Sequence, residues 1–183
     1  MSLTSFSLMA SYNFPLGISR KDPNFSKILQ IIKTFRGYET LEGLKAADEQ
    51  VRMHLAQQLR KAAEESTEAR KKLESDMHLR LLPDFDAMVR QIHSCKDRLQ
   101  DRLQGKIAAC KAYRPEADPI REAYNLDFKV LSDAENVFNL MQEFARMARE
   151  DMMLTNIHKI DLSLGDIAES MEKRESTIDC MLR

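Results

Sequence analysis

The feature that most constrains the fold is a long apolar stripe with helical spacing. After Leu41, apolar or small residues recur at alternating steps of three and four, first at Leu44, Ala47, Val51, Leu55, Leu59 and Ala62 and then at Leu73 and Met77. This alternation is typical of helices that pack against other helices. The 183 residues include only five Gly and five Pro, and 31% are charged, which favours long solvated helices. We therefore predict an all-α protein, an elongated antiparallel coiled coil of three long helices.

Prolines mark the predicted boundaries between the long helices. Pro83 breaks the ladder of backbone hydrogen bonds, so a kink or a new helix is expected there, and the stripe continues through Phe85, Val89, Ile92, Leu99, Leu103 and Ile107. In the stretch YRPEADPIRE, Asp118 is suited to cap a helix that begins at Pro119. The third stripe runs through Ile120, Tyr124, Phe128, Leu131, Ala134, Phe138, Met141, Ala145, Ala148 and Met152, slips near TNIHKIDLSLGD, and recovers at Ile160, Leu164, Ile167 and Met171. As a single helix of roughly 60 residues it would be about 90 Å long.

These patterns divide the chain into three segments. Residues 1–23 show no sustained period and are interpreted as a flexible arm. Residues 24–36 form a short basic amphipathic helix in this prediction, because apolar residues recur there at helical spacing, at Phe25, Ile28, Leu29, Ile32 and Phe35. Asn24 is its expected N-cap and Gly37 its expected stop. Residues 38–183 make up the long-helix domain.

The third helix is apolar over more than one narrow stripe, so we expect it to contact a second surface besides its hairpin partner. A homodimer would supply that surface, through an interface formed by Phe128, Leu131, Phe138, Met141 and Met152. The alternative is a single chain folded back into a compact bundle of four or five helices, with breaks at Gly37, at Pro83 and around Gly165.

Motifs for catalysis and for metal or cofactor binding are missing from the sequence. The four histidines, His54, His78, His93 and His158, form no repeated Glu-x-x-His pair, and there is no phosphate-binding Gly loop, GxSxG, HExxH or zinc-ligand spacing. Three cysteines without a CxxC, Cys95, Cys110 and Cys180, argue against a disulfide framework and favour a reducing, cytoplasmic compartment. No apolar run is long enough to span a bilayer. We expect a protein that is not an enzyme and that has no metal site and no cofactor.

The charge distribution gives the main functional indication. The formal net charge is −1, which indicates no general affinity for nucleic acid. Between residues 102 and 114 the chain nevertheless carries four basic residues and no acidic one, at Arg102, Lys106, Lys111 and Arg114. The helix 24–36 adds Lys27, Lys33 and Arg36. A Lys or Arg near an anionic leaflet contributes about 1 kcal/mol, so both segments are candidate sites for anionic lipid headgroups. A local alternative is that Lys111 and Arg114 complement the negative C-terminal end of the second helix.

The order of these elements resembles the BAR domain family over roughly residues 40–175. The resemblance rests on the Pro-interrupted second helix LLPDFDAMVRQIHSCKDRLQDRLQ, the basic hairpin, and a third helix that begins ADPIREAYNLDFKVLSDAENVFNLMQEF. It implies a banana-shaped dimer with a six-helix core that binds anionic membranes and senses or bends them. By position it makes Lys106, Lys111 and Arg114 residues of the arm tip, and it makes the helix 24–36 similar to a membrane wedge. Lys96, Arg98 and Arg102 would belong to the concave face.

Three functions remain open at this point. The first is a non-enzymatic, dimeric BAR-like module that binds anionic membranes and senses or generates curvature, as a cytoplasmic peripheral membrane protein. The second is a coiled-coil adaptor or scaffold for other proteins, without direct membrane binding, in which the apolar face of helix 24–36 is buried within the chain. The third is a compact bundle with an effector or regulatory role. Nucleic acid is not an expected partner.

Overall fold

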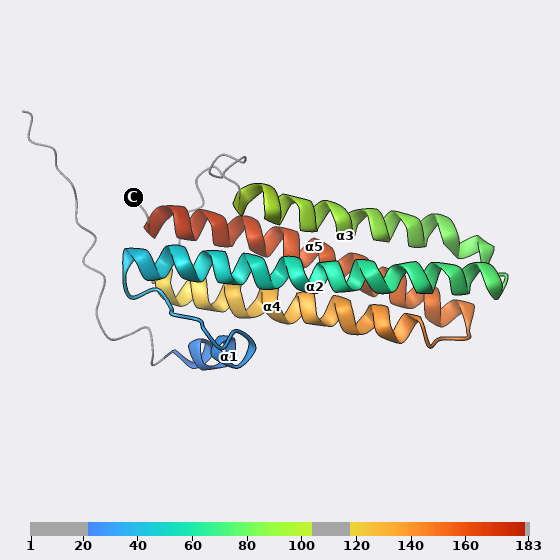
Figure 1. Cartoon of the computed structure of the whole chain (residues 1–183), viewed down its shortest axis with the longest axis horizontal. Helices are drawn as coiled ribbons and strands as arrows, with labels where there is room; N and C mark the ends of the chain where they lie inside the picture. The colour runs from blue at the N-terminus through green and yellow to red at the C-terminus, as the bar shows by residue number, and fades with distance from the viewer. Residues whose placement is uncertain (1–21, 104–117, 182–183) are drawn as a thin grey trace, which may run out of the picture.

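The computed structural model describes residues 22–103 and 118–181, and all regular structure within these residues is helical. The α-helices are α1 (Pro23–Ile31), α2 (Leu41–Ser75), α3 (Leu82–Leu103), α4 (Pro119–Phe144) and α5 (Glu150–Met181), with a short 3₁₀ helix, η2 (Leu79–Leu81), before α3. Figure 1 shows α2 to α5 side by side along the long axis, and α1 packs on α4 near one end of them. The all-α prediction is confirmed, and the structure is a bundle of five helices formed by one chain.

Helix α1 lies within the predicted segment 24–36 but is shorter. It begins at Pro23, whose missing N–H is not needed in the first turn. Its N-cap is Asp22, whose side chain accepts a hydrogen bond from the backbone N of Asn24 at 2.8 Å. The predicted cap at Asn24 and the predicted continuation to residue 36 are therefore wrong. Gly37 does mark the break before α2, with a φ of 75°, a value that favours glycine.

α2 is one helix of 35 residues. Its predicted stripe is buried except at Met77, which lies beyond the end of the helix and is exposed. Every stripe position from Leu44 to Ala62 is buried, and so is Leu73. Between them the small side chains of Ser66 and Ala69 are buried as well, so the buried face of α2 continues where the apolar pattern weakens. The chain then turns at residues 76–78, before Pro83, which lies in the first turn of α3.

The predicted third helix is in fact two helices. Helix α4 ends at Phe144, the chain turns within residues 145–149, and α5 runs back along α4 (Figure 1). This turn contains neither Gly nor Pro, and α5 continues unbroken through Gly165, where the alternative fold placed a break. Lys72 Nζ, at the end of α2, donates hydrogen bonds to the backbone oxygens of Ala145 and Met147 at 2.9 and 2.6 Å. These bonds satisfy carbonyls at the end of α4, so the turn depends on a residue of another helix.

The turn after α4 changes the environment of the predicted dimer interface. Leu131 and Met141 are buried in the core of the single chain, with 1% and 0% of their surface exposed. Phe128 and Phe138 are half-buried and pack against the same core, whereas Met152 is exposed. Because α5 and α1 contact α4, a second copy is not needed to bury Leu131 or Met141.

Candidate functional site

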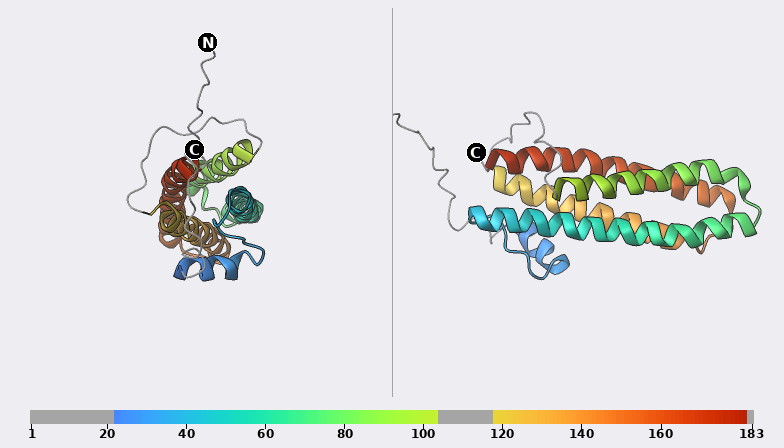
Figure 2. Two further views of the ribbon diagram at one scale, coloured as in Figure 1. Left: turned by 90° about the vertical axis from the view of Figure 1, so that its left-hand side faces the viewer. Right: turned by 45° about the horizontal axis from the view of Figure 1, so that its top comes forward.

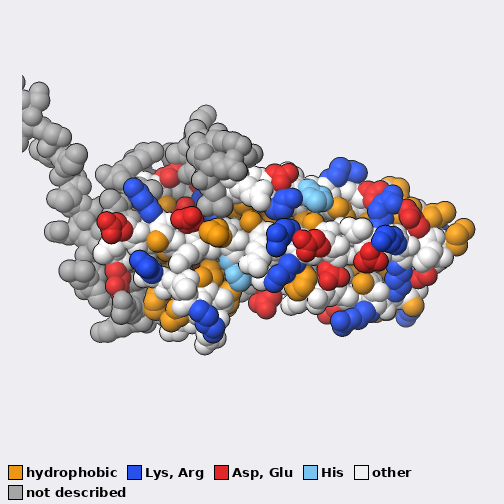
Figure 3. All heavy atoms as spheres, in the orientation of Figure 1, with side chains coloured by type: hydrophobic (Ala, Val, Ile, Leu, Met, Phe, Trp, Pro, Cys, Tyr) orange, Lys and Arg blue, Asp and Glu red, His pale blue; other side chains and the backbone are white. Residues whose placement is uncertain are grey.

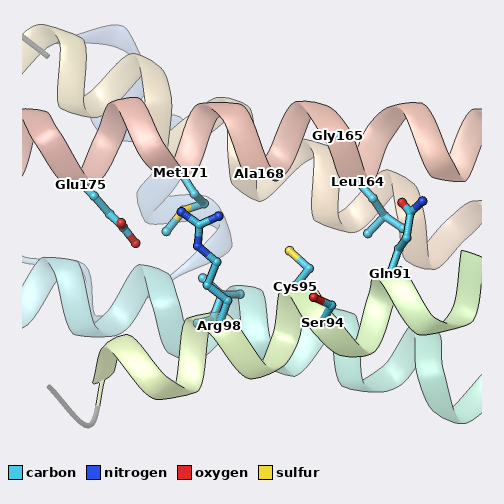
Figure 4. Close-up of a pocket in the computed structure, with 10 residues that line it drawn as sticks. Gln91, Ser94, Cys95, Arg98, Leu164, Gly165, Ala168, Met171 and Glu175 are labelled. Atoms are coloured by element: carbon cyan, nitrogen blue, oxygen red, sulfur yellow. The ribbon is translucent and has the colours of Figure 1, made fainter. Parts of the chain in front are cut away.

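A groove with a volume of about 230 Å³ lies between α3 and α5. Figure 4 shows side chains that line it. Those of α3 are Gln91, Ser94, Cys95, Arg98 and Leu99, and those of α5 are Leu164, Gly165, Ala168, Met171 and Glu175. Both sets recur at steps of one, three or four residues, so each helix turns one continuous face toward the groove.

Small residues keep the middle of the groove open. Gly165 has no side chain, and a Cβ built at this position would meet no atom within 4 Å. Ala168 follows on the same face of α5, and Ser94 lies on α3. Leu164 and Met171 are buried, with only 3% and 4% of their surface exposed. The groove therefore combines apolar side chains at its base with low walls, which allows another backbone to approach closely.

One end of the groove is polar. Arg98 Nη2 donates a hydrogen bond to Glu172 Oε1 at 3.0 Å and so links α3 with α5. Glu175 is buried, and its Oε1 accepts a hydrogen bond from Arg52 Nη1 of α2 at 2.9 Å. In Figure 4, Glu175 and Arg98 both point into the space between the two helices. The groove therefore ends at charged groups that connect three helices.

Behind this end lies a buried ion network, which comprises Tyr38, Asp48, Arg52, Asp127, Arg174 and Glu175. Arg174 is at its centre and is fully buried. Its guanidinium donates to the carboxylates of Asp127 and Asp48, and its Nη2 donates to Tyr38 Oη at 3.2 Å. The Tyr38 hydroxyl donates to Asp127, and Arg52 Nε lies 3.1 Å from both carboxylate oxygens of Asp48. The network thus joins α2, α4, α5 and the segment before α2.

Burial and pairing act in opposite directions on the pKa values in the network. Burial raises the pKa of Tyr38 well above its usual value. Burial also raises the pKa of Asp127, although Arg174 opposes the rise. For Asp48 burial alone would raise the pKa, but Arg174 and Arg52 hold it below its ordinary value. Because these groups bond to one another, the network holds α2, α4 and α5 together behind the groove, and only its member Glu175 lines the groove itself.

Two members of the network occupy stripe positions and so carry a sequence signal. Asp127 lies three residues after Tyr124 and four before Leu131, on the buried face of α4. Arg174 lies in the same way between Met171 and Ile178 of α5. A charged residue at such a position needs a partner of opposite charge on another helix. Two opposite charges at stripe positions of different helices would have indicated the pair.

The predicted lipid-binding residues are only partly within the described chain. Lys106, Lys111 and Arg114 lie outside the described residues. Arg102 belongs to the last turn of α3, and its side chain also lies outside them. The remaining three, Lys27, Lys33 and Arg36, are exposed on α1 and on the segment that follows it. Lys27 Nζ lies 4.7 Å from the ring centre of Phe128 on α4, a cation–π contact.

Cys95 is held as a thiol in the groove. Burial raises its pKa to about 11, although the nearby Arg98 opposes the rise, so the nucleophilic thiolate is scarce at neutral pH. Within the ranges 22–103 and 118–181, no three or more His, Cys, Asp or Glu side chains come close enough together to hold a metal ion. None of the helices that the structure describes has the length and apolar character needed to cross a membrane.

Comparison with known proteins gives no relative. No protein-family model, no curated protein and no solved structure matches the chain.

Proposed function

We propose that the protein is a non-enzymatic adaptor that binds an amphipathic helix of a partner protein in the groove between α3 and α5. The observation that supports this proposal is the apolar groove with its small-residue walls at Gly165, Ala168 and Ser94. A helix bound in such a groove places apolar anchors at i, i+3 or i+4, and i+7. The lining residues of α5 span about three helical turns, or roughly 16 Å, which matches two or three anchors.

The charges beside the groove favour a basic partner helix. Helix α5 carries eight acidic and three basic residues. Asp161 and Glu172 lie on the same face as Gly165 and Ala168, because each is four residues from one of them. Oδ1 of Asp161 is buried and has no hydrogen-bond partner in the described chain, and burial raises the pKa of this residue. A Lys or Arg of the partner helix would supply the missing donor.

The position of α1 also supports an adaptor rather than a membrane wedge. Most of its apolar face is buried within the chain: Ile28 has 0% of its surface exposed and Ile32, just after the helix, has 8%, whereas Leu29 has 36%. Phe25 packs edge-to-face on Tyr124 of α4, with ring centres 5.8 Å apart. Insertion of this face into lipid would require α1 to leave α4, which would uncover apolar surface on both helices.

A displayed library of amphipathic helices tests the proposal, with Lys beside the apolar stripe in half of the members and Glu in the other half. Selection on the wild-type protein should enrich the Lys-flanked helices. Gly165→Gln fills the groove at a position where the free protein has room, so it should abolish binding of the selected helices. Asp166→Gln, on the exposed side of α5, is the matched control and should preserve it. Absence of enrichment, or equal binding to Gly165→Gln, would contradict the proposal.

An anionic membrane is the second candidate partner. Lys33 and Arg36 are exposed between α1 and α2, and Figure 2 shows that α2 begins and α3 ends near the same end of the bundle. Lys33 and Arg36 are therefore exposed near the end of the bundle at which α3 ends. The BAR-like homodimer belongs to this candidate, because that family forms its membrane-binding face from two copies.

Cosedimentation with anionic liposomes tests the second candidate. Replacing Lys106, Lys111 and Arg114 with Glu should reduce pelleting, and replacing Lys33 and Arg36 with Glu should reduce it further, because both changes remove attraction to the headgroups. Neutral liposomes are the control. Gly165→Gln should leave pelleting unchanged, which separates this function from helix binding. No pelleting of the wild type, or equal pelleting of all variants, would rule out the membrane candidate.

A further inference from the structure

The end of the bundle far from α1 exposes apolar side chains. Among the residues that the structure describes, six large apolar side chains are exposed, and three lie at this end: Met77 at 75%, Leu79 at 48% and Met152 at 47%. We call these three residues the distal patch. Met77 and Leu79 belong to the connection between α2 and α3, and Met152 to the first turn of α5. In Figure 3, hydrophobic side chains gather at the right-hand end, where α2 meets α3.

The two connections at this end lie against each other. Arg80 Nη2, in η2, donates a hydrogen bond to Glu150 Oε2, at the start of α5, at 2.7 Å. The distal patch and the charged residues around it therefore form one surface across the end of the bundle.

Met77 occupies a backbone position that disfavours a methionine. Its φ is 60°, in the left-handed region, where residues other than Gly and Asn are strained. Its N–H bonds to the Glu74 oxygen at 3.3 Å, and the N–H of His78 bonds to the Leu73 oxygen at 2.9 Å. This is a Schellman helix end, whose left-handed residue is usually Gly. Glycine would relieve the strain and remove exposed apolar surface, so the methionine needs a reason outside the folded chain.

The charges at this end suit a second copy of the same chain. Residues 76–84 and 145–152 carry three basic and four acidic residues. The signs alternate in space, since Arg80 pairs with Glu150 and Arg149 Nη2 lies 2.6 Å from Asp151 Oδ2. A surface of this kind can meet itself about a two-fold axis and exchange its ion pairs. An anionic membrane would instead meet four carboxylates.

The side of the bundle formed by α4 and α5 suits self-association less well. Helices α4 and α5 together carry thirteen acidic and five basic residues, so two copies joined along them would place acidic surfaces against each other. Leu131 and Met141, which the sequence assigned to a dimer interface, are buried in the core of one chain. A second copy is therefore not expected to bind along α4 and α5.

We propose that two copies of the protein associate end to end through the distal patch. A bundle of helices that are each about 10 Å across is about 20 Å wide, so its end offers roughly 400 Å² per copy. This is about half of the area that a standard interface buries per partner. An interface of this size is typical of weak association. It does not depend on the groove between α3 and α5.

Sedimentation velocity of the full chain from about 10 to 500 µM tests this proposal, and the sedimentation coefficient should rise with concentration. Met77→Gly should raise the Tm by about 2–4 °C, because it relieves left-handed strain. The same change should weaken the association at least about fivefold, because it removes the most exposed apolar group of the patch. Met53→Ala is the matched control, since Met53 is 57% exposed in the middle of α2, and it should leave association unchanged.

Charge exchange provides a second variant that does not depend on backbone strain. Arg80→Glu should weaken the association, and Arg80→Glu together with Glu150→Arg should restore it. A constant sedimentation coefficient up to about 500 µM overturns the proposal, and so does an association that Met77→Gly leaves unchanged. Binding to anionic vesicles that Met77→Gly abolishes while the protein remains monomeric also overturns it, because the patch would then contact lipid.

Discussion

Arg174→Met should destabilise the fold strongly, because it removes the central cation of the buried ion network. The side chain of Arg174 has 0% of its surface exposed and donates to Asp127, which is also fully buried. Removing one partner of a buried ion pair costs about 3–5 kcal/mol, because the other charge is left uncompensated. For a protein of this size each 1 kcal/mol lowers the Tm by about 2–4 °C. The variant should therefore melt at least about 6 °C below the wild type.

Urea unfolding followed by circular dichroism measures the loss of free energy. Lys173→Met is the matched control: it removes the neighbouring cation of α5, whose Nζ bonds only an exposed Glu169 at 2.6 Å, and it should leave the Tm unchanged. Adding Asp127→Asn to Arg174→Met should recover much of the stability. The amide oxygen still accepts from Tyr38, and no buried negative charge remains at residue 127.

The pH dependence of the same variant provides an independent measurement. Without Arg174, nothing in the pair opposes the effect of burial, so the raised pKa of Asp127 should rise further. In the unfolded state an Asp carboxyl has a pKa of about 3.9. A higher pKa in the folded state lowers the free energy of unfolding at high pH, and this effect disappears as the pH falls toward the pKa of the unfolded state. The difference in unfolding free energy between wild type and Arg174→Met should therefore shrink between about pH 7 and pH 4. A loss below about 1 kcal/mol at neutral pH, or a loss that does not change with pH, would refute this reasoning.

Three further predictions concern single side chains. Tyr38→Phe removes a buried hydroxyl that donates to Asp127 and should lower the unfolding free energy measured in urea by about 1–3 kcal/mol. Because burial raises the pKa of Tyr38, the folded state keeps a proton that the unfolded state loses, and wild-type stability should fall above about pH 10. The stability of the variant should depend less steeply on pH in this range. Lys72→Met removes two hydrogen bonds at the end of α4 and should accelerate amide hydrogen exchange in residues 145–149 relative to the middle of α4; equal protection would contradict the capping role. Cys95 can be followed alone in the double variant Cys110→Ser, Cys180→Ser. At neutral pH its thiol should react with a disulfide reagent at least about tenfold more slowly in the folded protein than in urea, since burial raises its pKa to about 11. Equal rates would show that the thiol is accessible.

The helices that the sequence predicts well are those whose evidence is local. In α2 the residues from Leu44 to Ala62 are buried as their spacing predicts, because the helical period alone determines which residues share a face. The turn at residues 145–149 has no such evidence, since it contains neither Gly nor Pro. Its carbonyls bond to Lys72, which precedes Ala145 by 73 positions. Only the packing of α2 beside α4 makes this turn favourable, and a single stripe does not contain that information.

Gly165 shows the same limit for the candidate site. Its residue type suggested a helix break, because glycine lowers helix stability by about 1 kcal/mol relative to alanine. In the structure it is an ordinary position of α5, and its importance comes from the open space above it, toward α3. That space depends on how far apart α3 and α5 lie. The sequence therefore places Leu99, Leu164 and Met171 on the apolar faces of their helices but does not show that the two helices leave a groove between them.

The buried ion network joins residues that are far apart in the sequence, which bears on the order in which we expect the helices to assemble. Tyr38 and Arg174 are 136 positions apart, and Arg52 and Glu175 are 123 positions apart. Contacts between such distant residues form late, because their loop-closure entropy must be overcome first. A chain that has paired α2 with α4 but not yet added α5 would hold Asp127 beside Tyr38 without the cation of Arg174. Such an incomplete bundle gains little free energy from the contact between Asp127 and Tyr38, so the network favours the complete bundle over partly assembled forms.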